Sequence, residues 1–283
     1  MRVPLLLAVV AASAATLFLG ACVGDDPVAP VSPGAPDDAA AKADSSPPSA
    51  DTGAPDAGKE AGEKRFCETQ APVTGVADFF CADFDGPKLD EGFTNAIIPD
   101  GGALIRTTDI FFSPPASLAT SGGARLLWAK SGAMAFAELA VQVRVNAGTL
   151  GGVVPPSAAS ATLVELSSID TTVSIRYTRG GTVEGTSNYT GYYMETSYCP
   201  AACALAQKKI ATPLPLDVWT NVEVVWTSSG LVKVSFNGVS VLATMGFAST
   251  STKVSATLGI VSFGSVGMGR HAFDDFIVSV KRL

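Results

Sequence analysis

The chain has 283 residues, of which 47% are hydrophobic and only 16% are charged, and its formal net charge is −7. The charge is uneven: residues 23–65 hold nine acids and four bases, whereas residues 66–283 hold seventeen acids and fourteen bases. The larger part is therefore close to neutral and has no basic patch able to neutralise phosphates, which argues against nucleic acid as a partner. The length allows one large domain or two small ones.

Residues 1–21 have the layout of a secretory signal. Arg2 supplies one positive charge, an uncharged run rich in Leu, Ala and Val follows, and small residues close it. The run is just long enough to span a bilayer, but it is so rich in alanine that its insertion energy is modest. We therefore interpret it as a signal peptide rather than a membrane-spanning helix.

The end of this run, Leu19-Gly20-Ala21-Cys22, resembles the lipobox of bacterial lipoproteins. The resemblance implies cleavage before Cys22 and a diacylglyceryl thioether on its sulfur, with ordinary secretion as the alternative. Two or more acyl chains anchor a protein stably in a lipid bilayer, whereas one gives marginal binding. Valine follows the cysteine where an Asp would favour the inner membrane of enteric bacteria. The expected location is thus the cell envelope, at the outer membrane.

Residues 22–65 comprise the lipidated cysteine and a segment dominated by Pro, Ala, Asp, Ser and Gly, with no aromatic residue, Leu, Ile or Met between 23 and 65. Such a segment cannot bury enough apolar surface to offset chain entropy, so it is expected to be disordered. A flexible chain of this length spans roughly 35 Å root-mean-square. We interpret it as a tether that separates a folded domain from the lipid.

Composition changes at Phe66, where aromatic and β-branched residues appear. About a dozen short segments with two-residue alternation follow, separated by Gly, Pro, Ser or Asn. This pattern predicts an all-β, two-sheet antiparallel sandwich over residues 66–283. Only Ala201–Ile210 resembles a helix. The clearest alternation lies in Ala135–Val145, Ala161–Ser167, Thr172–Thr178, Trp219–Trp226 and Ala256–Phe263.

Asn237 and Gly238 lie between two alternating runs within residues 232–242. Both central residues of a type I′ turn need positive φ, which Asn and Gly tolerate, so a two-residue β-hairpin is predicted. Trp219 and Trp226 are predicted to lie in the core, and Trp128 stays unassigned.

Four segments, in order along the chain, together resemble the concanavalin A-like lectin/glucanase superfamily, which includes laminin-G-like modules. They are Phe80–Gly86 (FCADFDG), Ser113–Leu118 (SPPASL), Trp219–Leu242 with its hairpin, and Phe273–Val278 (FDDFIV). The resemblance covers residues 75–283 and implies a jelly-roll sandwich. The family hairpin usually has Asp-Gly where this chain has Asn-Gly, a difference that the turn tolerates.

Glucanases of this superfamily carry their catalytic carboxylates on one strand as E-x-D-x-x-E, and this sequence lacks that pattern. Glycoside hydrolysis needs two carboxylates that face the scissile bond. The acids Glu138, Glu165, Glu184, Glu195 and Glu223 are each isolated in the sequence. No hydrolase pair is therefore predicted among them.

Other catalytic arrangements are also missing. Asp83 and Asp85 share a strand face about 7 Å apart, but they lie at the edge of the expected fold. His271 is the single histidine, and the residues expected of alginate-lyase relatives are absent. No nucleophile elbow, phosphate-binding loop or dinucleotide fingerprint is present. The sequence therefore assigns no catalytic residue and favours a role other than catalysis.

The superfamily often holds one structural Ca²⁺ between its first and last strands, on the convex side. By this resemblance the candidate ligands are Asp274 with Asp83 or Asp85, and hard carboxylate oxygens suit Ca²⁺. The alternative is that Asp274 or Asp275 is a solvated charge that discourages edge-to-edge pairing of strands.

Tyr189, Tyr192 and Tyr193 cluster in the segment NYTGYYMETSYC. Tyrosine offers a flat apolar face and a hydroxyl group, which suits sugar binding, so these three are ligand-binding candidates. Alternation turns Tyr192 and Tyr193 to opposite faces, so at most part of the cluster can line one surface. Ordinary strand packing is the alternative.

Beyond Cys22, four cysteines remain: Cys67, Cys81, Cys199 and Cys203, an even number in an oxidising compartment. Three pairings are possible, and sequence proximity favours Cys67–Cys81 and Cys199–Cys203. The first would close a loop of about 15 residues and contribute roughly 3 kcal/mol. Zinc lacks ligands, because the C-x-x-x-C spacing has no nearby histidine.

These features predict an envelope-displayed lipoprotein whose sandwich is a binding module for a polysaccharide or an envelope protein. The alternatives are a divergent glycan-active hydrolase or lyase, and a structural envelope protein without a ligand.

Overall fold

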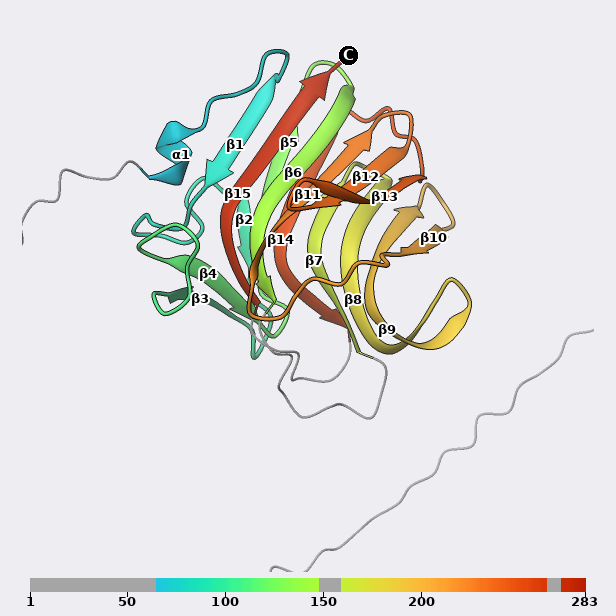
Figure 1. Ribbon diagram of the computed structural model, residues 1–283. Coiled ribbons are helices and arrows are strands. Elements are labelled where there is room, and N and C mark those ends of the chain that lie inside the picture. The colour runs from blue at the N-terminus through green and yellow to red at the C-terminus, as the bar shows by residue number, and fades with distance from the viewer. Residues whose placement is uncertain (1–64, 148–158, 264–270) are drawn as a thin grey trace, which may run out of the picture. The chain divides into compact units, whose positions relative to one another are not determined.

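The computed structural model describes residues 65–147, 159–263 and 271–283 (Figure 1). These residues form fifteen strands and one short helix, and the strands pair into two antiparallel sheets that share one core. The predicted all-β, two-sheet sandwich is therefore confirmed. The predicted signal peptide, Cys22 and the tether as far as residue 64 lie outside the described residues.

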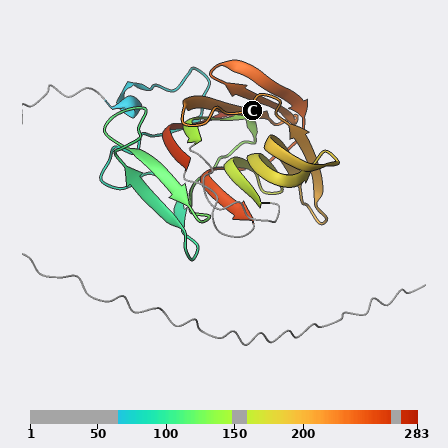
Figure 2. The ribbon, with the colours of Figure 1, turned by 60° about the horizontal axis from the view of Figure 1, so that its bottom comes forward.

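The eight-stranded sheet has the order β13-β12-β11-β6-β15-β4-β3, with β1 also paired to β15. Its strands are β1 Asp78–Ala82, β3 Ala103–Thr107, β4 Ser117–Ser121, β6 Phe136–Ala147, β11 Trp219–Thr227, β12 Leu231–Phe236, β13 Val239–Met245 and β15 His271–Arg282. Figure 2 shows β3 and β4 (green) at one side of the domain and the β8–β9 ribbon (yellow) at the other.

The seven-stranded sheet has the order β10-β9-β8-β7-β14-β5-β2. Its strands are β2 Asn95–Ile97, β5 Arg125–Ser131, β7 Ala159–Ser167, β8 Thr171–Val183, β9 Thr186–Tyr198, β10 Ala204–Lys209 and β14 Lys253–Phe263. The five clearest predicted strands correspond to β6, β7, β8, β11 and β14. The helical interpretation of Ala201–Ile210 is wrong: six of these residues form β10, which pairs with β9 in continuous register, so sheet pairing overrides local helix propensity.

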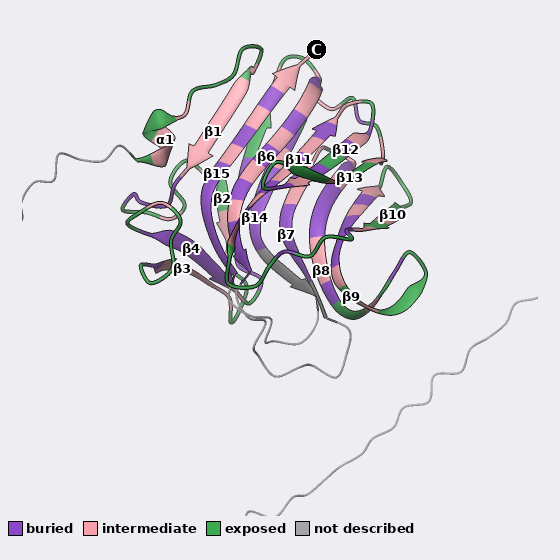
Figure 3. Ribbon diagram, viewed as in Figure 1, coloured by how far each residue is buried: buried purple, intermediate pink, exposed green. Residues whose placement is uncertain are grey.

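Alternating side chains build the core between the sheets. Figure 3 shows buried and half-buried residues alternating along β6, β11 and β15. Trp226 is fully buried against Phe136, with ring centroids 4.9 Å apart, and Trp128 is 6% exposed. The prediction that Trp219 lies in the core is wrong. It shares the outer face of β11 with Asn221, because odd-numbered residues of this strand point away from the core.

The predicted hairpin and disulfides are confirmed. Asn237 and Gly238 have φ of 49° and 78° and connect β12 to β13. Disulfides join Cys67 to Cys81 and Cys199 to Cys203. The first ties β1 to α1 (Phe66–Thr69), the only helix among the described residues. No helix in this part of the chain is long and apolar enough to cross a membrane.

Strand β15 changes partner halfway along one side. Residues His271–Phe273 pair with β4, whereas Phe276–Val280 pair with β1. On its other side β15 pairs with β6 along its length, with two irregularities, one after Asp274 and one between Lys281 and Arg282. Asp275 has a φ of 51°, as expected at a β-bulge. Two consecutive aspartates therefore lie where the neighbouring strand changes.

Candidate functional site

A row of polar side chains crosses the outer face of the seven-stranded sheet, the face turned away from the core. The register pairs Glu165 with Ser174 and Ser174 with Glu195. Glu195 is in turn paired with Gln207. Core residues flank Glu165 and Ser174 along their strands, so alternation turns this set outward. We call Glu165, Ser174, Glu195 and Gln207 the outer row.

Hydrogen bonds fix Glu195 at the centre of the outer row. Arg176 forms an ion pair with Oε1 of Glu195, and both side chains are 14% exposed. Gln207 donates from Nε2 to Oε2 of the same carboxylate over 2.9 Å. The guanidinium of Arg176 also lies 5.9 Å from the ring centroid of Tyr193, its partner in the register. A charge-assisted pair of this kind holds a guanidinium in one orientation.

The second carboxylate of the outer row, Glu165, is less firmly held. Its burial raises its pKa. A hydrogen bond from Ser167 Oγ to Oε1 (3.3 Å) and the charges of Arg125 and Arg176 oppose this increase, while Glu195 adds to it. Carboxyl groups with a perturbed pKa beside fixed cations are typical of functional sites.

The tip of the β8–β9 hairpin contacts β10 at the Gln207 end of the outer row. Glu184 and Gly185 form its turn, with φ of 48° and 73°. The Glu184 carboxylate accepts hydrogen bonds from Lys208 Nζ (2.9 Å) and from the amide of Lys209 (3.1 Å). The amide of Glu184 donates to Oε1 of Gln207 over 3.4 Å. The hairpin therefore forms a wall at this end of the face.

The structure does not bring the three predicted ligand-binding tyrosines together on one surface. Tyr192 is 4% exposed and belongs to the core, and Tyr193 is 4% exposed on the opposite side of β9. Tyr189 is half-buried; its hydroxyl donates to the carbonyl of Tyr192 over 2.8 Å. Lys209 Nζ lies 5.5 Å from the ring centroid of Tyr189. Only Tyr189 leaves part of its ring accessible.

The outer row was not found from the sequence. Glu165 and Glu195 are isolated acids along the chain, yet β8 alone separates the strands that carry them. Pairing register decides which residues of three strands align, and a shift of one residue would turn Glu165 to the other face. The only available indication was that each acid lies within an alternating segment.

Asp274, predicted as a calcium ligand, accepts hydrogen bonds from the loop between β3 and β4. Its Oδ2 accepts hydrogen bonds from the amides of Phe112 and Ser113, each 3.0 Å long. Its Oδ1 accepts one from the amide of Asp275, also 3.0 Å long. Both oxygens of this fully buried carboxylate thus accept hydrogen bonds from backbone amides.

Two neighbouring aspartates each keep one oxygen without a partner. Asp275 Oδ1 accepts from Ser113 Oγ (2.8 Å) and Asp85 Oδ1 accepts from the amide of Ala116 (3.2 Å). Oδ2 of Asp275 and Oδ2 of Asp85 are buried without a hydrogen bond. Asp83 accepts long bonds of 3.4 Å from the amides of Cys67 and Asp85. An unsatisfied buried carboxylate oxygen costs free energy unless a proton or a cation neutralises it.

Burial raises the pKa of Asp85, Asp274 and Asp275. The pKa of Asp85 rises to about 6 and that of Asp274 to about 7, mainly through loss of solvation, with the charge of a neighbouring aspartate adding to each increase.

Asp83, Asp85, Asp274 and Asp275 lie where β1 ends and β15 changes its neighbour, and we call them the aspartate junction. This junction fits a hard cation only in part. The two oxygens without partners, on Asp85 and Asp275, are ligands of the kind that Ca²⁺ prefers. Within the described ranges, however, no three His, Cys, Asp or Glu side chains are grouped closely enough to hold a metal ion. A cation here would therefore need carbonyl or water oxygens to complete its coordination.

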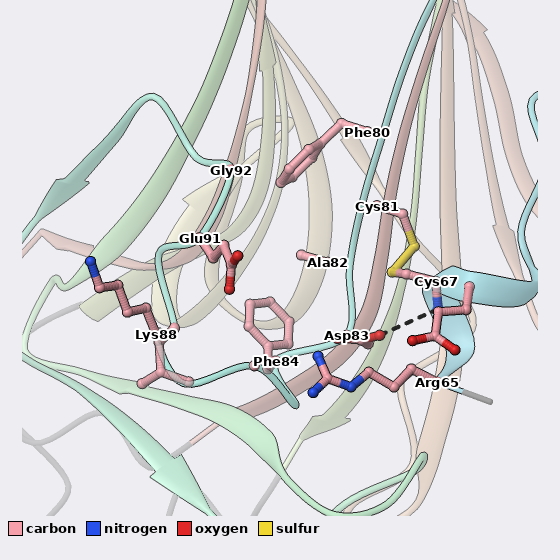
Figure 4. A pocket seen from close by; sticks show the side chains of 13 residues that line it. Arg65, Cys67, Phe80, Cys81, Ala82, Asp83, Phe84, Lys88, Glu91 and Gly92 are labelled. Carbon is pink, nitrogen blue, oxygen red and sulfur yellow. Dashed lines mark hydrogen bonds between the residues drawn. A yellow bond between two sulfur atoms is a disulfide. The ribbon is translucent and has the colours of Figure 1, made fainter. Parts of the chain in front are cut away.

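A hollow of about 390 Å³ lies beside the junction (Figure 4), where α1, the end of β1 and the following loop meet. Arg65 and Lys88 line it together with the acids Glu68, Asp83 and Glu91, and the Cys67–Cys81 disulfide forms part of its wall. Charges of both signs line it, so it favours neither an anion nor a cation.

No protein-family model matches this chain, and no curated protein matches it. Solved structures share its fold. An endo-β-1,4-glucuronan lyase from the fungus Trichoderma reesei has a TM-score of 0.50 and 12% identity, with 72% of this chain and 95% of that chain covered. Cip1, a cellulose-induced protein, has a TM-score of 0.48 and 14% identity over 70% and 96% of the two chains.

Domain 4 of AbnA, a GH43 extracellular arabinanase from Geobacillus stearothermophilus, was solved with arabinotriose. It has a TM-score of 0.45 and 15% identity over 72% and 92% of the two chains. At such identities the likeness concerns the fold alone. The chain is therefore a two-sheet jelly-roll β-sandwich with a fixed polar row on the outer face of one sheet.

The raised pKa values of Asp85 and Asp274 predict that the protein becomes more stable as the pH falls. A folded-state pKa above the unfolded value of about 3.9 means that the folded state binds protons more tightly, so stability is lost as pH rises through about 6 to 7. With EGTA present, we expect the Tm to rise by about 5 °C or more between pH 8 and pH 5. Differential scanning calorimetry measures this.

Asp85→Asn should flatten the dependence, because it removes one of the titrating groups. Asp109→Asn, at an exposed position of the loop between β3 and β4, is the matched control and should leave the dependence unchanged. A Tm that falls steadily as the pH is lowered from 8 to 5 would contradict the raised pKa values of Asp85 and Asp274.

Proposed function

We propose that this protein is a lipid-anchored envelope lipoprotein whose sandwich binds a polysaccharide on the outer face of the seven-stranded sheet. The observation that carries the proposal is the ordered outer row, in which Glu195 is fixed by Arg176 and Gln207 outside the core. Sugar hydroxyls bind well to polar groups whose positions are set before the ligand arrives, because little side-chain entropy is then lost. An envelope protein as ligand is the competing outcome of the tests.

Binding is favoured over cleavage by the state of the two carboxylates. A glycosidase needs one carboxyl group as acid and a second, available carboxylate as base or nucleophile. Glu165 has the raised pKa of an acid, but both oxygens of Glu195 are already occupied by Arg176 and Gln207. The outer row therefore offers one available carboxyl group rather than a pair. A glycan-active hydrolase or lyase remains the second candidate, because Glu165 and Glu195 share one face.

The comparison with solved structures supports a glycan as ligand at the level of fold. The glucuronan lyase from Trichoderma reesei has this two-sheet architecture over nearly its whole length. The likeness supports the proposal through this shared architecture, and the outer row is the surface on which we place the ligand.

The lipid anchor is proposed from Leu19-Gly20-Ala21-Cys22, in the part of the chain outside the described residues. Acylation of Cys22 would attach the protein to a bilayer, at the outer membrane as the valine after the cysteine favours. Residues 23–65 would then carry the sandwich at a distance from the lipid.

We also propose one structural Ca²⁺ at the aspartate junction. Asp85 and Asp275 would hold it through the oxygens that lack partners, with Asp83 beside them. A bound divalent cation would neutralise buried negative charge where β1 ends and β15 changes its neighbour.

Polysaccharide binding is tested by affinity electrophoresis of the full chain through gels that contain soluble xylan, β-glucan, arabinan or polygalacturonate. We expect at least one polymer to retard the chain. Glu195→Gln should weaken that retardation about tenfold, because it removes the charge that orients Arg176 and a charged hydrogen bond contributes roughly 1.5 kcal/mol or more. Glu223→Gln, on the outer face of the other sheet, is the matched control. Retardation by none of the polymers would refute the proposal.

Incubation with the same polymers distinguishes binding from cleavage. We expect neither new reducing ends nor unsaturated products. Their appearance, together with their loss in Glu165→Gln, would establish the enzymatic alternative.

The cation is tested by thermal unfolding with millimolar Ca²⁺ or with EGTA. Ca²⁺ at 100 times its Kd contributes about 2.7 kcal/mol, so we expect the Tm to rise by about 5 °C or more. Asp275→Asn and Asp85→Asn should abolish this response. Asp274→Asn should lower the Tm in both conditions, because it loosens the loop, while leaving the response in place. Equal midpoints for the unaltered chain would exclude the site.

The anchor is tested by metabolic labelling with radioactive palmitate in a bacterial host. We expect label in the full chain and none in Cys22→Ser, which should leave the membrane fraction. Label that persists in Cys22→Ser, or is absent from both chains, would contradict lipidation at this residue.

A further inference from the structure

A second hollow opens at the β5 end of the same outer face. It has a volume of about 410 Å³ and lies where β5 ends, β14 begins and β7 turns into β8. Two lysines, Lys130 and Lys253, line it together with the hydroxyl-bearing residues Thr94, Ser131, Ser167, Ser168 and Ser255. Lys253 lies on the outer face, whereas Lys130 pairs with the core residue Val254 and lines the hollow near the end of β5. We call it the lysine groove.

The lysine groove is positively charged in an acidic protein. Lys130 and Lys253 are both exposed, and neither forms an ion pair with any residue that the structure describes. No carboxylate lines the groove. Asp170 lines the adjoining hollow that shares Lys253. Against a net charge of −7 for the whole chain, two cations without an acid among the lining residues form a local attraction for anions.

The lysine groove is continuous with the outer row. Ser167 lines the groove, and its hydroxyl donates to Glu165 of the outer row over 3.3 Å. Arg176 lies on β8, the strand next to the one that carries Glu165. Lys209 lies on β10, two strands from β8, and pairs with Tyr193 of the strand between them. From β14 to β10 the face crosses four strand spacings, about 19 Å. An extended ligand could therefore touch both the groove and the outer row.

The lysines and the hydroxyl-bearing residues of the groove suit different parts of a charged sugar. The lysine ammonium is a compact charge on a flexible stem and attracts an anion without demanding one fixed geometry. The serine and threonine hydroxyls can both donate and accept, as sugar hydroxyls require. Glu165 and Asp170 are the acids near the groove that repel an anion. The charges of Arg125 and Arg176 lie close enough to Glu165 to offset its repulsion.

We infer that the polysaccharide bound by this protein is acidic, and that Lys130 and Lys253 hold its anionic groups while the backbone of the polymer lies along the outer row. This inference rests on the proposed function and names the class of ligand for that site. Carboxylated and sulfated sugars share the required chemistry, and the experiment separates them.

The probes are two matched pairs of soluble polymers: polygalacturonate with its fully methyl-esterified form, and dextran sulfate with dextran. Affinity electrophoresis of the full chain at low salt measures each Kd. We expect one acidic polymer to bind at least about tenfold more tightly than its neutral partner, and added salt to remove most of this preference. The acidic polymer that is preferred identifies the anionic group.

The variant Lys130→Gln/Lys253→Gln should weaken binding of the preferred acidic polymer about fivefold and leave binding of its neutral partner unchanged. Lys233→Gln, at an exposed position on β12 in the other sheet, is the matched control and should bind normally. A Tm equal to that of the unaltered chain verifies folding, and the single variants Lys130→Gln and Lys253→Gln serve if the double variant unfolds.

Three outcomes would overturn the inference: equal affinity for charged and neutral polymers, unchanged binding by the lysine variants, or equal loss of acidic and neutral binding. In each case a polymer whose binding still depends on Glu195 leaves the proposed function in place. If no polymer binds at all, the proposed function fails with it.

Discussion

The last strand, β15, determines how the eight-stranded sheet is assembled, because three other strands pair with it. β6 runs along one side, whereas β4 and β1 share the other. The loop between β3 and β4 has backbone amides near Ser113 that need hydrogen-bond acceptors, because buried donors without partners are costly. Asp274 supplies them from within β15. The buried carboxylates are thus a consequence of one strand having two neighbours on the same side.

The two faces of the seven-stranded sheet have different roles. Its inner face supplies apolar residues to the core, and its outer face carries polar groups that satisfy one another through Arg176, Glu195 and Gln207. A connected network of this kind has few alternative arrangements. The bent β8–β9 hairpin adds contacts at one end, through Glu184 and the lysines of β10. The sheet therefore presents an ordered surface without drawing residues from the core.

Alternation and turn chemistry predicted much of the fold, because both act over a few residues. Asn237 and Gly238 marked a hairpin through their tolerance of positive φ, and short separations identified both disulfides. Pairing between distant segments was beyond such local patterns. It aligned Glu165 with Glu195, and it turned Ala201–Ile210 into an edge strand. The role of Asp274 was also out of reach, since its partners lie about 160 residues away, on the loop before β4.

The disulfide from Cys67 to Cys81 has a mechanical consequence. Arg65, the first described residue, lies two positions before Cys67, so a pull transmitted from the N-terminal side enters the sandwich through a covalent bond to β1. The residues between the two cysteines are bypassed and carry little of the load. Strand β1 is paired with β15 over five residues, so the force acts on a whole ladder of backbone hydrogen bonds. A force applied at residue 65 is thereby distributed over the β1–β15 pairing instead of peeling β1 away one residue at a time.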